Sequence, residues 1–303
     1  MSPYVEATAL AFASALCVGP VSIWLDRASW TARAPRAAVV LWQSIGLSGA
    51  LGAIGAGLAV ATARFGVGVG PGTRELVDKV VDGRPLSGLG LPDALGLTLA
   101  VDVAIVLAAV VGIVVWRTVR TRSRHRRILD LVRVDGQRAD GAILLDDPRA
   151  TAYCLPGLRP RIVVSSGAID LLASTELAAV VEHERGHAHE RHGLVMLSLA
   201  SLTEPVRWIP YARRAPRAVA TLLEMAADDF ATRRHEPLVL AAALVRMGED
   251  HLGPRFTFCA GATAVPARVA RLLADSRGSK RTALLASVAA GFVVAVPVLI
   301  GTR

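Results

Sequence analysis

The sequence predicts a polytopic α-helical membrane protein with four spans and a mainly helical α+β domain between spans three and four. Apolar residues make up 53% of the 303 residues and charged residues only 19%, whereas soluble domains usually carry about a quarter charged residues. Four stretches are apolar and nearly free of charge over the length of a membrane helix. The region from 128 to 278 differs from them, because it mixes strand-like and helix-like patterns.

Each predicted span has about the 20 apolar residues that a helix needs to cross the hydrocarbon layer. The first three cover about 7–25, 37–63 and 94–116, and together they define a membrane domain at 1–127. The fourth lies in 279–303. The third span contains Asp102, which is either a functional residue within the membrane or an interfacial one, since it lies early in the span.

Basic residues gather on one side of the predicted spans. They precede the second span, follow the third and precede the fourth: Arg27, Arg33 and Arg36; Arg117, Arg120, Arg122, Arg124, Arg126 and Arg127; Arg277, Lys280 and Arg281. The positive-inside rule therefore predicts a multi-pass protein of the cell membrane, with 128–278 cytoplasmic and both termini external. The net charge of +9 is explained by topology and by contact with the lipid bilayer, so we expect no direct nucleic-acid binding.

The cytoplasmic region opens with strand patterns and continues with helical ones. Residues 141–147 and the β-branched run at 161–165 are predicted strands. Residues 176–192 are predicted to form a helix capped by Ser174 or Thr175. An apolar run at 194–203 is too short to span the bilayer, and a further helix is predicted at 217–234, after Pro216.

The helix at 176–192 contains the sequence His183-Glu-Arg-Gly-His187. Residues four apart lie on one face of a helix, so two imidazoles can bind one zinc ion while Glu184 between them reaches a water molecule on the metal. Zinc would lower the pKa of that water toward about 7. Glu184 would then act as the general base. His189 and His192 are expected to be solvated or capping residues.

A catalytic zinc ion keeps three protein ligands and an open position. Glu224 is the predicted third ligand. Asp228, four residues later, is predicted to hydrogen-bond the outer nitrogen of a ligand histidine. Spacing alone leaves a second interpretation open, in which these residues and Asp229 form a solvated acidic face.

The order HERGH and then EMAAD resembles the gluzincin membrane proteases, in which such a helix is followed by Glu-x-x-x-Asp on a later helix. Two branches fit, the HtpX-like proteases and the BlaR/MecR-type receptor proteases. Three spans before the protease region and one after it, and the Pro-x-x-Trp-Ile-Pro stretch at 205–210, resemble BlaR/MecR. The resemblance implies an edge strand that pairs with extended substrate, matched here by Arg161, Ile162, Val163, Val164 and Ser165.

The chain also departs from these families. We expect no penicillin-binding sensor domain after the last span, and the HtpX-like His-Pro appears here as Val265-Pro266. The acidic residue often found five positions after the motif is His192. The group that stabilises the oxyanion stays open, with four candidates: Tyr211, His235, His251 and Arg268.

These patterns lead to the hypothesis of a zinc-dependent membrane endopeptidase that cleaves a cytoplasmic or membrane-associated protein. The BlaR/MecR resemblance implies a transcriptional repressor as the substrate. One alternative is an HtpX-like quality-control protease. Another is a non-catalytic membrane transducer with a structural zinc ion, although such a site would favour four protein ligands. The oligomeric state is left open.

Overall fold

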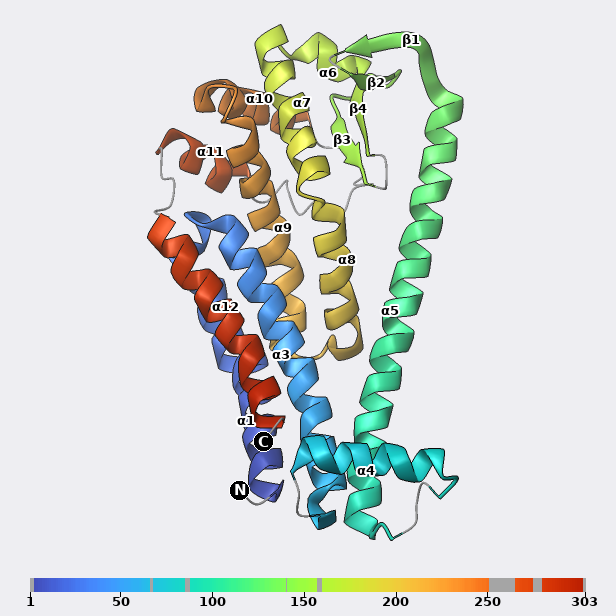
Figure 1. The fold of residues 1–303 in the computed structure, drawn as a ribbon. Helices are drawn as coiled ribbons and strands as arrows, with labels where there is room; N and C mark the ends of the chain where they lie inside the picture. Colours follow the sequence, from blue (N-terminus) through green and yellow to red (C-terminus); the bar gives the residue numbers. More distant parts are fainter. Residues whose placement is uncertain are drawn as a thin grey trace.

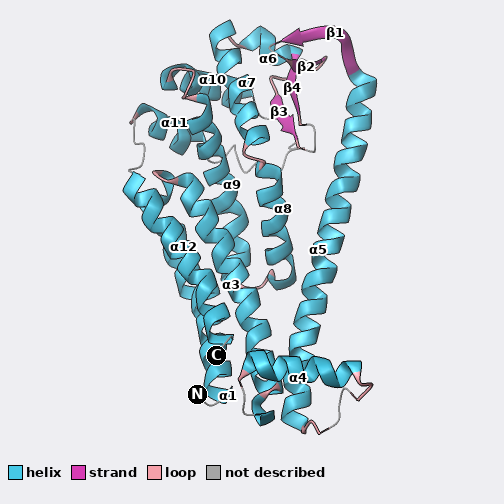
Figure 2. Ribbon diagram, viewed as in Figure 1, coloured by secondary structure: helices cyan, strands magenta, loops and turns pink. Residues whose placement is uncertain are grey.

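A computed structural model of the chain describes residues 3–65, 68–84, 88–139, 141–156, 160–250, 265–274 and 280–301. The fold is mostly helical, with a single small sheet among these residues (Figures 1 and 2). Long helices form the lower part in the view of Figure 1, and the sheet lies at the upper end beside α6 and α7.

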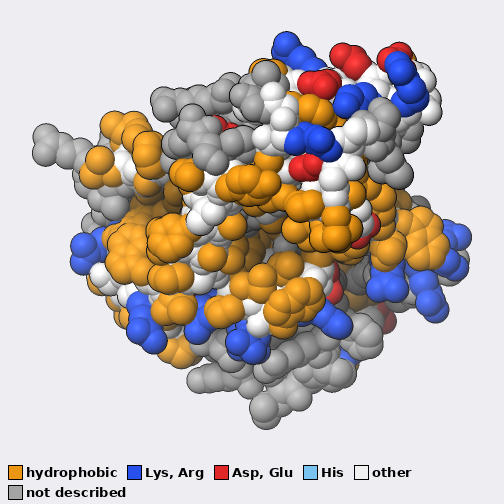
Figure 3. All heavy atoms as spheres, turned by 90° about the horizontal axis from the view of Figure 1, so that it is seen from below, with side chains coloured by type: hydrophobic (Ala, Val, Ile, Leu, Met, Phe, Trp, Pro, Cys, Tyr) orange, Lys and Arg blue, Asp and Glu red, His pale blue; other side chains and the backbone are white. Residues whose placement is uncertain are grey.

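Three helical segments are long and apolar enough to cross a membrane. They are residues 4–27, 35–61 and 91–121. The first combines α1 (Pro3–Leu16) and α2 (Ser22–Arg27), joined by a π-helical turn at Cys17–Val21 that contains Pro20. Seen from below, hydrophobic side chains cover much of the surface, with Lys and Arg gathered along its margin (Figure 3). The three segments support membrane association.

The second and third segments approach each other closely through glycine. They are α3 (Pro35–Ala61) and α5 (Leu91–Val132). A Cβ atom on Gly96 of α5 would lie 2.8 Å from the backbone oxygen of Gly57 and from the backbone nitrogen of Ala61. Backbone atoms cannot yield to such a contact, so these small residues set the helix separation. The helix α5 also continues past the boundary predicted at residue 127, which therefore falls inside it.

The fourth predicted span corresponds to α12 (Lys280–Gly301), which runs along α3 (Figure 1). Its described apolar portion at 284–295 is shorter than a full span, so a fourth crossing stays a prediction. Between α3 and α5, the amphipathic helix α4 (Val69–Val81) lies across the lower end of the bundle.

The sheet contains β1 (Arg133–Ala139), β2 (Ala142–Leu145), β3 (Ala152–Leu155) and β4 (Arg161–Ser165) in the order β1-β2-β4-β3. The strand β4 is parallel to β2 and antiparallel to β3. The strand predicted at 161–165 is therefore present, but the expectation that it is an edge strand is wrong. Its backbone already pairs with a strand on each side.

The helices of the upper part are α6 (Ser166–Leu171), α7 (Ser174–His189), α8 (His192–Thr203), α9 (Pro210–Ala231), α10 (Pro237–Asp250) and α11 (Val265–Leu273). The predicted helix 176–192 is split, because Arg191 has a left-handed φ of 53° that ends α7 and starts α8. The N-cap of α7 is Ala173, whose backbone N–H donates to the Glu176 carboxylate at 2.9 Å. Helix α9 starts seven residues before Arg217, with Pro216 inside it.

One buried core joins the long helix α3 to α8 and α9. Trp42 and Ile45 of α3 pack with Leu199 of α8 and with Tyr211 and Val219 of α9. The Tyr211 hydroxyl donates to the backbone oxygen of Trp42 at 3.1 Å. The upper helices are thus packed directly on a candidate membrane helix, and α10 covers α7 on another side.

Candidate metal centre

The predicted metal ligands lie where α7 crosses α9. His183 and His187 share one face of α7, and Glu224 lies on α9. Gly186, between the two histidines, allows the helices to approach, because a Cβ atom there would lie 3.0 Å from the Cβ of Phe230 on α9. The sequence of α7 thus supplies both the two imidazoles and the close packing that brings Glu224 to them.

The three side chains converge on one point. The two Nε2 atoms of His183 and His187 are 3.2 Å apart, and each lies 3.4 Å from a carboxylate oxygen of Glu224. Zinc binds nitrogen and oxygen at about 2.0–2.2 Å in a tetrahedron, which separates ligand atoms by roughly 3.3–3.6 Å. The two imidazole nitrogens are close to that separation, and the two oxygens of Glu224 face them, Oε2 toward His183 and Oε1 toward His187, so the site has about the size that a zinc ion requires. The donor set fits the metal.

The outer nitrogens of both histidines meet further polar groups. Nδ1 of His183 lies 3.0 Å from Oδ1 of Asp228, at hydrogen-bonding distance but outside the strict angular range. Nδ1 of His187 lies 2.8 Å from Nδ1 of His192. When the Nδ1 atoms carry the protons, both Nε2 lone pairs point to the common centre. Asp228 thus lies beside the outer nitrogen of His183.

His192 is not the solvated or capping residue that the sequence suggested. Its side chain is buried and contacts both His187 and Glu190. The left-handed turn at Arg191 starts a new helix, which places His192 beside the end of α7. His189 is exposed and stacks on Phe230, with ring centres 5.4 Å apart. The prediction of one continuous helix at 176–192 could not show that His192 is buried and His189 is exposed.

Arg268 of α11 holds the two carboxylates in place. Its guanidinium donates to both oxygens of Asp228, at 2.8 and 2.6 Å, and lies 3.0 Å from Oε2 of Glu224. Burial alone would raise the pKa values of both carboxyl groups. The charge of Arg268 and the His183 contact instead lower the pKa of Asp228 to about 2 and that of Glu224 still further. The acidic pair is therefore buried and ionised, not a solvated face.

The electrostatics of the two histidines differ. Burial alone would lower the pKa of His183, but the close contacts with the carboxylates of Asp228 and Glu224 raise it to about 9. Burial lowers the pKa of His187 to about 3, although the charge of Glu224 opposes this effect. His187 is thus already in the neutral form that a metal ligand needs, whereas His183 must release its proton when a metal binds.

Glu184 lies beside the ligands and is positioned by the sheet. Burial raises its pKa to about 7, with the nearby His183 charge and a hydrogen bond from the backbone of Cys154 acting in the opposite direction. A carboxyl group with such a pKa suits general base catalysis near neutrality. Cys154 belongs to β3, which ends the sheet beside β4 among the described strands. The strand that contacts Glu184 is therefore β3, and Arg161–Ser165 of β4 lies one strand further into the sheet.

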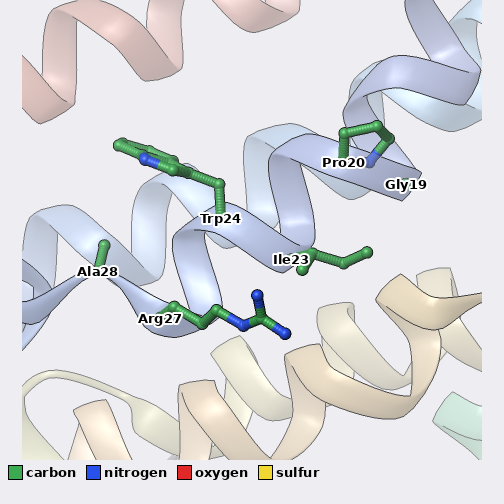
Figure 4. Close-up of a pocket in the computed structure, with 6 residues that line it drawn as sticks. All are labelled: Gly19, Pro20, Ile23, Trp24, Arg27 and Ala28. Carbon is green, nitrogen blue, oxygen red and sulfur yellow. The ribbon is translucent and has the colours of Figure 1, made fainter.

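The four oxyanion candidates lie in different places. All three guanidinium nitrogens of Arg268 contact the carboxylates of Asp228 and Glu224. The hydroxyl of Tyr211 contacts α3 in the core described above. His235 lies in the turn after α9, and His251 is outside the described residues. An apolar hollow lined by Gly19, Pro20, Ile23, Trp24, Arg27 and Ala28 lies on the first membrane segment and contains none of the predicted site residues (Figure 4).

The arrangement defines a class of site: a His-His-Glu group that could hold a metal, with a half-buried carboxyl group beside it, carried on paired helices of a protein with three candidate membrane helices. Residues 118–237 match the model of peptidase family M48. The match supports a membrane-type zinc metallopeptidase and includes every predicted ligand, but it ends before Arg268. No curated protein and no solved structure matches the chain.

Proposed function

We propose that the chain is a zinc-dependent endopeptidase of the cell membrane. His183, His187 and Glu224 would hold the metal, Asp228 would orient His183, and Glu184 would be the catalytic base. The observation that carries the proposal is the convergence of three ligand side chains next to the carboxyl group of Glu184, whose pKa is about 7. The two Nε2 atoms lie 3.2 Å apart, and each lies 3.4 Å from one of the two oxygens of Glu224. The M48 match supports the same reaction class.

Zinc, when bound at such a site, activates water and polarises the scissile carbonyl group. The chain's own groups do the rest. Glu184 accepts a proton from the attacking water and passes it to the leaving amine. We assign the alignment of an extended substrate to β3, because its Cys154 backbone contacts Glu184 and, among the described strands, it is the last one of the sheet on the side of the site. Strand addition of this kind gives affinity through the main chain.

The proposed topology has four spans, with a membrane domain at 1–127, a cytoplasmic protease domain at 128–278 and the fourth span at 279–303. Both termini would be external. The substrate is a cytoplasmic or membrane-associated protein. A transcriptional repressor follows from the BlaR/MecR resemblance, and broad quality-control substrates follow from the HtpX-like one. The three-ligand site with an adjacent base argues against a transducer with purely structural zinc.

The test is cleavage of a fluorescently labelled unfolded protein by the purified full chain in detergent. We expect cleavage that a zinc chelator stops and that added zinc restores. Glu184→Gln should cleave at least about 10²-fold more slowly, while the exposed Glu204→Gln should cleave like wild type. Equal cleavage by wild type and Glu184→Gln would remove the motif as the catalytic centre.

A further inference from the structure

A chain of polar contacts leads from the ligand His187 to the membrane helix α3. Nδ1 of His187 lies 2.8 Å from Nδ1 of His192, and Nε2 of His192 lies 3.3 Å from the carboxylate of Glu190. The same carboxylate accepts three contacts from Arg36, two from Nε at 3.0 Å and one from Nη2 at 2.6 Å. Arg36 is the second residue of α3.

The proton positions along this chain follow from the metal site. If Nε2 of His187 binds a metal, its proton is on Nδ1, which then donates to Nδ1 of His192. The proton of His192 must therefore be on Nε2, which faces Glu190. Burial alone would raise the pKa of Glu190, but the contacts with His192 and Arg36 lower it to about 2, so this carboxylate is an acceptor. Every donor then faces an acceptor.

The end of the chain at Arg36 is fixed by two further elements. Nη2 of Arg36 donates to the backbone oxygen of Ala226 on α9 at 2.8 Å, and Nη1 lies 3.5 Å from Asp229. Asp229 also contacts Arg271 of α11 at 2.7 Å, and Nε of Arg271 donates to the backbone oxygen of Ala32 at 2.7 Å. The start of α3 is therefore held to α9 and α11 as well as to α7.

We propose that His192 and Arg36 are positioning residues for His187, so that metal binding depends on how α3 docks against α7 and α9. An ion pair that only braces helices need not connect to a metal ligand, whereas the pair of Arg36 and Glu190 contacts His192, whose other nitrogen contacts Nδ1 of His187. A change in the membrane helices that withdraws Arg36 would release Glu190 and His192 and loosen His187. The inference rests on the metal site of the proposed function but not on peptidase activity.

Zinc affinity of the purified full chain in detergent, measured by competition with a chromophoric chelator, tests the first link. His192→Phe keeps a ring of similar size but cannot accept the His187 proton. We expect it to weaken zinc binding about 10–100-fold, as is usual for outer partners of metal ligands. His192→Asn keeps an acceptor near the Nδ1 position and should retain most of the affinity. Equal affinity in His192→Phe and wild type would overturn the proposal.

The link to the membrane is tested with Arg36→Gln. We expect a several-fold loss of zinc affinity and a changed visible spectrum of bound cobalt. The exposed Arg33→Gln, which removes the same charge from the same segment, should behave like wild type. In a His192→Phe background the Arg36→Gln change should have no further effect on affinity, since both act through one path. Additive losses of zinc affinity in the double variant, or no loss in Arg36→Gln alone, would refute the link. Neither result depends on whether the chain cleaves peptides.

Discussion

Replacement of Arg268 by Gln should destabilise the protein strongly unless zinc is present. The Arg268 side chain is only 4% exposed and contacts Glu224 and Asp228 at 2.6–3.0 Å. Gln is shorter and uncharged, so two adjacent buried carboxylates would lose their guanidinium partner and keep only His183 as a cationic neighbour. Removal of one partner from a buried ion pair typically costs about 3–5 kcal/mol. We expect a loss of that size in the free energy of unfolding.

Unfolding in detergent with a chelator, followed by circular dichroism, measures the loss. A decrease of about 3–5 kcal/mol corresponds to a melting temperature lower by roughly 6 °C or more. Zinc should restore much of the stability of the variant, because it binds the folded site and its charge, bound at Glu224, offsets part of the charge of the two carboxylates. The pair of Arg246 and Glu176, at 3.4 Å, provides the control. Its cation is 53% exposed, unlike that of Arg268, so Arg246→Gln should cost at most about 1 kcal/mol.

The pH dependence of the loss gives a second check. In wild type the pKa of Asp228 is about 2. The stability that the charged form contributes is therefore fully present above the unfolded pKa and is lost as the pH falls through about 2. Without Arg268 the carboxyl groups take up protons at higher pH, which removes the uncompensated charge. The difference between variant and wild type should therefore be largest at neutral pH and decrease on acidification. A loss below about 1 kcal/mol at pH 7 would refute the assigned role of Arg268.

Three further predictions concern the ligands, the base and the topology. Glu224→Ala should lose tight zinc binding in metal analysis of the purified protein, and unchanged zinc content would remove Glu224 from the ligands. Cleavage should decline as the pH falls through the pKa of Glu184, which is about 7 and lower beside a bound cation, because the base must be ionised; a rate constant that is flat from pH 7 to pH 4 contradicts this. Reporter fusions at residue 303 and near residue 140 should report opposite sides of the membrane, and matching signals would disprove the topology.

The parts of the site that follow from local spacing could be predicted from the sequence. His183 and His187 lie four residues apart on one helix, as do Glu224 and Asp228, and helical geometry alone places each pair on one face. The close approach of the two pairs could not be predicted from spacing, because it is a contact between two different helices. It depends on the packing of Gly186 against Phe230, and one local signal for it was the small residue inside the motif.

The remaining parts depend on turns and on long-range contacts. His192 reaches His187 because Arg191 adopts a left-handed conformation, which is uncommon for residues other than glycine and is not encoded by the helical pattern. Arg268 is 40 residues from Asp228 along the chain. Its short amphipathic helix, with Arg268 and Arg271 three residues apart on one buried face, was the available signal. The edge position of β3 depended on strand order, which alternation within one strand does not specify.

The core shared by α3, α8 and α9 has a consequence for how this protein can be divided. Trp42 and Tyr211 are each about 1% exposed, and their rings lie 5.9 Å apart across the junction between membrane and upper helices. A truncated chain that starts after α5 would leave the α8 and α9 side of that junction in water, as an apolar patch of the kind that drives aggregation. The part of the chain that carries the metal centre is therefore not a detachable module, and its folding unit includes the candidate membrane helix α3.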